Sequence, residues 1–250
     1  MNVQAIKDLL FKIADDQLIL GHRSSEWIGL GPLLEEDIAF ASKAQDKVGQ
    51  SLAFYRLLET LGEPEPDITA FSRKSVEFHN STFVELPNGE FDFSIIRLFL
   101  FDTAEHIRFE ALAQSSYQPL NNLANKLKGE SIYHIMHANE WIKQLGNADD
   151  TVERMQRELD YALPYALGVF EPSKFEEELI SDNIFSGEKA LQVLWQEKIG
   201  SILKDTQLVL PSFDGLVPEY GGRYGKHTEH LQPLLSEMGE VIQSDPNADW

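Results

Sequence analysis

Apolar side chains recur at steps of three and four residues along most of the chain, which is the spacing of one face of an α-helix. The first segment shows this pattern at Val3, Ile6, Leu9, Leu10, Ile13 and Leu20. Glycine and proline then punctuate the chain, for example at Gly62 and Pro64. The pattern predicts four long helices, over residues 3–21, 33–62, 91–116 and 120–145.

Shorter helices are predicted after and between these four. They cover residues 67–75, about 150–170, 173–180, 186–203 and 227–242. Residues 208–226 are rich in glycine and proline and predict a long loop. One short run, Leu208 to Leu210, is the only candidate for a strand. The sequence therefore predicts an all-α protein with a single domain over residues 1–250.

Composition and charge exclude several kinds of site and of binding partner. The chain has 250 residues, of which 42% are hydrophobic and none is cysteine, so disulfides, cysteine nucleophiles and cysteine-bound metals are excluded. It carries 41 acidic against 21 basic residues, a net charge of −20. Such a surface repels nucleic acid and anionic membranes and suits a basic protein partner. No signal peptide or membrane span is apparent, and we expect a cytoplasmic protein.

Acidic residues on long helices raise the question of a di-iron site. Ferritin-like bundles bind two irons with a Glu from each of two helices and a Glu-x-x-His pair from each of the others. No helix here has an intact pair, because Gly49 follows Asp46 at the third position and Tyr133 follows Glu130. The pattern is typical of a di-iron site that has lost ligands, or of polar helix residues with no metal role. The best candidate positions are Asp46, Glu105, Glu130 and His134, with Asp15 and Asp102 as second choices.

The most specific motif lies near the C-terminus, where residues 221–231 read Gly-Gly-Arg-Tyr-Gly-Lys-His-Thr-Glu-His-Leu. This segment resembles the C-subunit family of the bacterial phenylacetyl-CoA 1,2-epoxidase. The Asp46-x-x-Gly-Gln50 element, Pro87-Asn88-Gly89 and Glu130-x-x-Tyr-His134 agree with the family in order and spacing. The motif residues are Gly221, Gly222, Gly225, His227, Thr228, Glu229, His230 and Leu231.

The resemblance implies a ferritin-like antiparallel four-helix bundle with additional C-terminal helices. It also implies a non-catalytic structural subunit of a ring monooxygenase in aerobic phenylacetate catabolism, with no catalytic residue and no cofactor of its own. Its partners would be the di-iron catalytic A subunit and the other subunits of the complex, whose reductase uses NADPH, flavin and an iron–sulfur cluster. Alone, such a chain could form a homodimer. The alternative is a di-iron oxygenase or oxidase, active by itself with an unusual ligand set.

Overall fold

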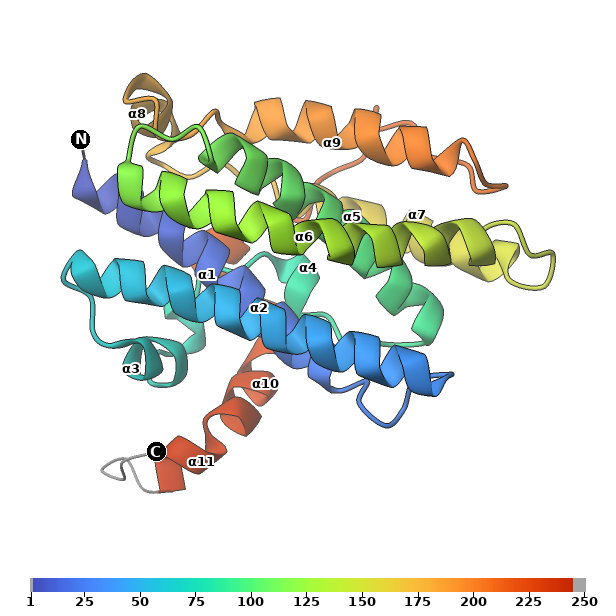
Figure 1. The fold of residues 1–250 in the computed structure, drawn as a ribbon, viewed down its shortest axis with the longest axis horizontal. Coiled ribbons are helices and arrows are strands. Elements are labelled where there is room, and N and C mark those ends of the chain that lie inside the picture. Colours follow the sequence, from blue (N-terminus) through green and yellow to red (C-terminus); the bar gives the residue numbers. More distant parts are fainter. Residues whose placement is uncertain (1, 245–250) are drawn as a thin grey trace. The chain divides into compact units, whose positions relative to one another are not determined.

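The computed structural model describes residues 2–244, and these residues form helices and connecting segments without any strand. The four long helices are α1 (Val3–Ser25), α2 (Leu34–Thr60), α5 (Phe91–Leu112) and α6 (Gln118–Leu145). The others are α3 (Pro66–Phe71), α4 (Thr82–Glu85), α7 (Val152–Gly168), α8 (Glu176–Ser181), α9 (Glu188–Leu203), α10 (Leu231–Met238) and α11 (Glu240–Ser244), with short 3-10 helices η1 (Ser75–Glu77) and η2 (Gly222–Tyr224). The prediction of an all-α protein is confirmed (Figure 1).

The chain divides into two compact units. The first contains the residues up to Ala5 and Asn88–Tyr220, and the second contains Ile6–Pro87 and the residues from Gly221 onward. The four predicted bundle helices are shared between these units, so the four-helix bundle and the single domain over residues 1–250 stay predictions. No helix in residues 2–244 is long and apolar enough to cross a membrane.

In the first unit, α5 is the central helix and contacts α6, α7 and α9 (Figure 1). Nearly every residue of α5 is buried, charged side chains such as Glu105 and Arg108 included, so the helix does not divide into one apolar and one solvent-exposed face. Trp195 of α9 is fully buried, and its Nε1 donates a hydrogen bond to the Leu100 carbonyl oxygen at 2.9 Å. This bond satisfies the polar atom of a side chain that otherwise packs among apolar groups.

In the second unit, α1 continues to Ser25, four residues beyond its predicted end at Gly21. A Cβ atom added at Gly21 would lie 3.0 Å from Val48 Cγ2 on α2. The glycine therefore serves the close approach of two helices and does not end the first one. Sequence pattern alone treats both uses of glycine in the same way.

Two other predictions were wrong in detail. The strand candidate Leu208–Leu210 forms no strand, because the Gln156 side chain accepts a hydrogen bond from Val209 N at 2.8 Å and donates one to Val209 O at 2.9 Å. The last helix, expected over residues 227–242, begins at Leu231 and is interrupted at Gly239 between α10 and α11. Residues 227 and 228 are not helical because they bind Glu85, as described below.

Candidate functional site

The glycine-rich motif docks backbone against backbone on residues 76–82 of the same unit. A Cβ atom at Gly222 would lie 2.2 Å from the Asn80 carbonyl oxygen, and one at Gly225 would lie 2.3 Å from the Val76 carbonyl oxygen. Gly225 also has a φ of +74°, which side chains disfavour. These two positions therefore need glycine for a close approach, and the motif is first of all a docking element.

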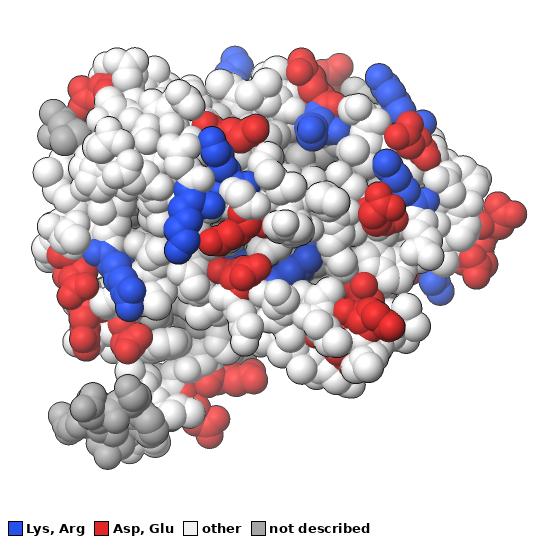
Figure 2. All heavy atoms as spheres, in the orientation of Figure 1, with Lys and Arg blue, Asp and Glu red and all other residues white. Residues whose placement is uncertain are grey.

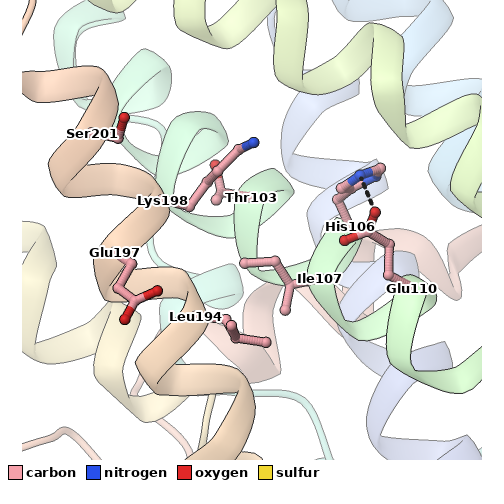
Figure 3. A pocket seen from close by; sticks show the side chains of 8 residues that line it. All are labelled: Thr103, His106, Ile107, Glu110, Leu194, Glu197, Lys198 and Ser201. Atoms are coloured by element: carbon pink, nitrogen blue, oxygen red, sulfur yellow. Dashed lines mark ion pairs between the residues drawn. The ribbon is translucent and has the colours of Figure 1, made fainter.

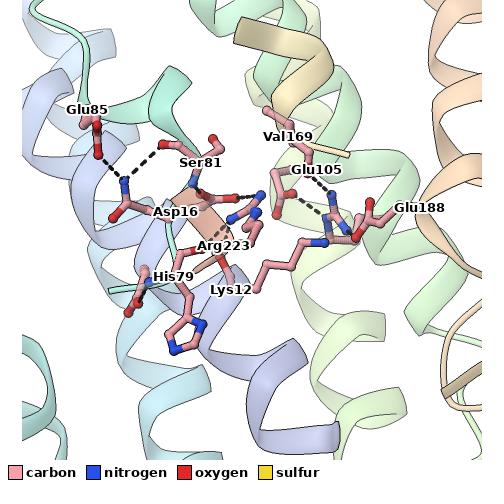
Figure 4. Close-up of polar contacts among 12 residues, drawn as sticks. Lys12, Asp16, His79, Ser81, Glu85, Glu105, Val169, Glu188 and Arg223 are labelled. Atoms are coloured by element: carbon pink, nitrogen blue, oxygen red, sulfur yellow. Dashed lines mark hydrogen bonds and ion pairs between the residues drawn. The ribbon is translucent and has the colours of Figure 1, made fainter. Parts of the chain in front are cut away.

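Arg223, inside this motif, is buried and reaches α1. Its Nη2 donates to Asp16 Oδ2 at 2.7 Å, and its Nη1 donates to the His79 carbonyl oxygen at 2.9 Å (Figure 4). Asp16 Oδ1 in turn accepts the Ser81 backbone N–H at 2.7 Å. The ion pair is 1–2% exposed, so the two charges neutralise each other away from water.

Glu85 of α4 fastens the second half of the motif. Its Oε1 accepts the Thr228 backbone N–H, and its Oε2 accepts Asn80 Nδ2 at 2.8 Å and lies 2.9 Å from His227 Nδ1. The other ring nitrogen of His227 lies 3.1 Å from the Phe78 carbonyl oxygen. Of the remaining motif residues, Leu231 is buried at the start of α10, whereas Glu229 is exposed. The His227 and Glu85 side chains and the close approach at the glycines therefore hold residues 221–231 against the rest of the unit.

Asp15, a second-choice metal position, has both carboxylate oxygens engaged within the second unit. Oδ1 accepts Tyr55 Oη at 2.6 Å and Arg73 Nη2 at 2.5 Å, and Oδ2 accepts the His79 backbone N–H at 2.7 Å and Arg73 Nη1 at 3.0 Å. Burial alone would raise the pKa of Asp15, but the charge and hydrogen bonds of Arg73, helped by His79 and Tyr55, hold it below its ordinary value. The guanidinium also lies 4.0 Å from the centroid of the Phe78 ring.

Glu105, a first-choice metal position, also pairs with an arginine, through its Oε1 in the first unit. Arg108 Nε donates to Glu105 Oε1 at 2.8 Å, and Arg108 Nη1 pairs with Glu188 of α9. The three side chains are 1–3% exposed. Burial would lower the pKa of Arg108, but the two carboxylates raise it above its ordinary value. Arg108 therefore remains a permanent cation between two buried acids.

The other candidates are divided between the units. Asp46 lies half-buried on α2 in the second unit; Asp102 and His134 are buried on α5 and α6 of the first, where Glu130 is half-buried. Residues 2–244 contain no group of three or more His, Asp or Glu side chains that could hold a metal ion. Arg73 engages both oxygens of Asp15, and Arg108 engages Oε1 of Glu105, so these oxygens are not available to a cation in this arrangement.

Sequence reasoning missed the arginines. Helix spacing named Asp15 and Glu105 but not their partners, Arg73 and Arg108. The Glu105-x-x-Arg108 spacing was a usable signal, because residues three apart share a helix face. Arg73 is 58 residues from Asp15 in sequence, and no local pattern connects them.

A cavity of about 360 Å³ opens between α5 and α9 in the first unit (Figure 3). It is lined by Thr103, His106, Ile107, Glu110, Leu194, Glu197, Lys198 and Ser201. His106 Nδ1 lies 2.7 Å from Ser131 Oγ, and burial, its largest influence, lowers the pKa of this histidine. Two carboxylates, one lysine and one histidine leave the cavity without a dominant charge that would select a ligand.

The architecture and the docked motif can be compared with known proteins. A family model described as "Phenylacetic acid catabolic protein" matches residues 1–250. The chain belongs to the phenylacetic acid catabolic protein family. The C subunit of the 1,2-phenylacetyl-CoA epoxidase of Escherichia coli (strain K12) is 30% identical over 241 residues, which are 96% of each chain. The resemblance inferred from residues 221–231 is confirmed, and in this member of the phenylacetic acid catabolic protein family that motif joins α1, α4 and the C-terminal helices.

Proposed function

We propose that the protein is a non-catalytic structural subunit of a multicomponent phenylacetyl-CoA 1,2-epoxidase, the ring monooxygenase of aerobic phenylacetate catabolism. In this proposal it works in the cytoplasm and binds the di-iron catalytic A subunit of the complex. The observation that carries the proposal is the match to the C subunit of an epoxidase over 96% of both chains. We further propose that α1, α2, α5 and α6 form the ferritin-like antiparallel bundle of such a protein.

The buried ion pairs support the non-catalytic role. Ferritin-like di-iron proteins need carboxylate oxygens that are available to metal. Here both oxygens of Asp15 and Oε1 of Glu105 accept hydrogen bonds from arginine instead. Because arginine is always protonated, it neutralises a buried carboxylate whatever the redox state of the complex. Its hydrogen bonds also hold neighbouring helices at fixed positions. The subunit would thus keep its polar interior as a scaffold, while the di-iron, flavin, iron–sulfur and NADPH chemistry takes place in its partners.

Reconstitution tests the proposal. The chain is co-expressed with the catalytic oxygenase subunit, the mixture is separated by size exclusion, and phenylacetyl-CoA turnover is measured with the reductase and NADPH. We expect the two chains to elute together, and we expect turnover to need both of them. Turnover by this chain with the reductase alone would contradict the proposal and favour the di-iron oxygenase. Failure of the chains to associate at micromolar concentration would also contradict it.

A further inference from the structure

Five large aliphatic side chains are exposed together where α1 leads into α2. They are Ile28, Leu30, Leu33, Leu34 and Ile38, with 53–72% of each residue exposed, and we refer to them as the apolar corner. Single exposed aliphatic residues are ordinary, but a contiguous group of them marks an interaction surface. The apolar corner lies within one unit of the chain, between residues 28 and 38.

The loop that carries the apolar corner has a fixed conformation. Asp37 Oδ1 accepts the backbone N–H groups of Gly29, at 3.1 Å, and Gly31, at 2.8 Å. Trp27 packs against the buried Phe40 ring with 5.8 Å between the ring centroids. These contacts anchor the loop at its start and across its turn while the aliphatic side chains remain outside. A surface that is already ordered loses less conformational entropy on binding.

Charge indicates what kind of partner fits. The charged side chains around the apolar corner that stay accessible are acidic: Glu35 is exposed and Asp37 is half-buried, whereas Glu36 is buried and Glu26 pairs with Arg23 at 2.6 Å. Figure 2 shows red acidic side chains among uncharged atoms at the lower right, over the N-terminal end of α2. A second copy of the chain would bring the same acidic border and another net charge of −20 to the contact. A partner with apolar side chains bordered by lysine and arginine is complementary instead.

We infer that the apolar corner docks a partner protein whose own apolar patch is bordered by basic side chains. The inference rests on the proposed function and assigns this docking to the catalytic oxygenase subunit. The aliphatic side chains supply the buried centre of the interface, and Glu35 at its border supplies electrostatic attraction during the approach.

Binding of the purified oxygenase subunit to full-length variants tests this inference. Leu30→Asp/Leu34→Asp places two charges in the apolar corner, and Val209→Asp/Val217→Asp places the same two charges at other exposed aliphatic positions. We expect the first variant to raise Kd by ~100-fold and the second to change it less than threefold. Glu35→Lys should slow association and weaken its dependence on salt. Equal thermal unfolding of the variants, followed by circular dichroism, establishes that each one folds.

The outcomes separate the inference from the proposed function. If the wild type and the apolar-corner variant bind the oxygenase subunit equally, the inference is wrong and the proposed function stands. If the wild type does not bind the oxygenase subunit, both are wrong. If the apolar-corner variant loses self-association but still binds the oxygenase subunit, the apolar corner is a contact between copies of the chain and the inference is overturned.

Discussion

Replacing Arg108 by methionine removes the cation that lies between two buried acids. Glu105 and Glu188 would then keep their negative charges at side-chain exposures of 1–3%, without the guanidinium that now neutralises them. Breaking a buried ion pair by removing one partner costs about 3–5 kcal/mol of stability. Arg108 contacts two carboxylates, and we therefore expect Arg108→Met to lower the free energy of unfolding by at least about 3 kcal/mol.

A matched variant separates the effect of charge from the effect of packing. Arg108→Met combined with Glu105→Met and Glu188→Met removes all three charges while it keeps similar volumes. Apolar replacement of a whole buried ionic group is often close to neutral in stability. We expect the triple variant to recover at least half of the stability that the single variant loses.

Urea unfolding followed by far-ultraviolet circular dichroism measures both effects. The midpoint should move to lower urea concentration for Arg108→Met, with the slope unchanged if only the folded state is affected. A loss below about 1 kcal/mol for the single variant would refute the reasoning. A triple variant as unstable as the single one would also refute it, because the loss would then come from packing and not from unpaired charge.

Three further predictions concern the motif and the buried acids. Gly222→Ala places a Cβ atom 2.2 Å from the Asn80 carbonyl oxygen, so it should cost about 1–3 kcal/mol and speed proteolysis of the docked tail. Arg73 holds the pKa of Asp15 in the folded protein below its ordinary value in spite of burial. The ionised carboxylate therefore stabilises the fold at pH values above the unfolded pKa of about 3.9, and this stabilisation is lost as pH falls through the lower folded pKa. Asp15→Asn should therefore flatten the decrease in unfolding free energy that the wild type shows below about pH 4. Glu130→Ala should lower stability, by about 1–3 kcal/mol if it strands a hydrogen-bond partner, and should reduce turnover only as far as the complex fails to assemble.

The first two of these predictions have matched controls. Gly49→Ala adds a Cβ atom with nothing within 4 Å inside a helix, and it should keep or raise the stability. Asp149→Asn at an exposed position should leave the acid dependence as in the wild type. Unchanged proteolysis of Gly222→Ala, or an Asp15→Asn variant with the wild-type slope, would contradict the corresponding argument. For Glu130→Ala, normal assembly with lost turnover would point to a direct role in the chemistry.

Most helices could be predicted from the sequence because the patterns that specify a helix lie within the helix itself. Apolar spacing located α2, α5, α6 and α9 to within a few residues at most ends. The errors arose where a distant segment decides the conformation. Gly21 is a contact with α2 and not a helix end, and His227 is held out of the last helix by Glu85, which is 142 residues away in sequence.

Part of the candidate site could also be predicted, because some of its residues belong to local sequence patterns. The motif at residues 221–231 identified the family, but its physical role needs the segment on which it docks. Six acidic or histidine positions could be named from helix spacing, whereas their partners could not. Arg73 in a loop and Arg223 in η2 reach Asp15 and Asp16 from far along the chain, and a sequence read in local windows carries no sign of either contact.

Iron content tests the central claim most directly, because the account assigns the buried acids to arginine partners and the di-iron centre to another protein of the complex. The chain is purified alone from cells grown with abundant iron, and bound iron is measured by elemental analysis against protein concentration. The account predicts far less than one iron per chain. Two irons per chain would contradict it and would establish a di-iron site in this protein.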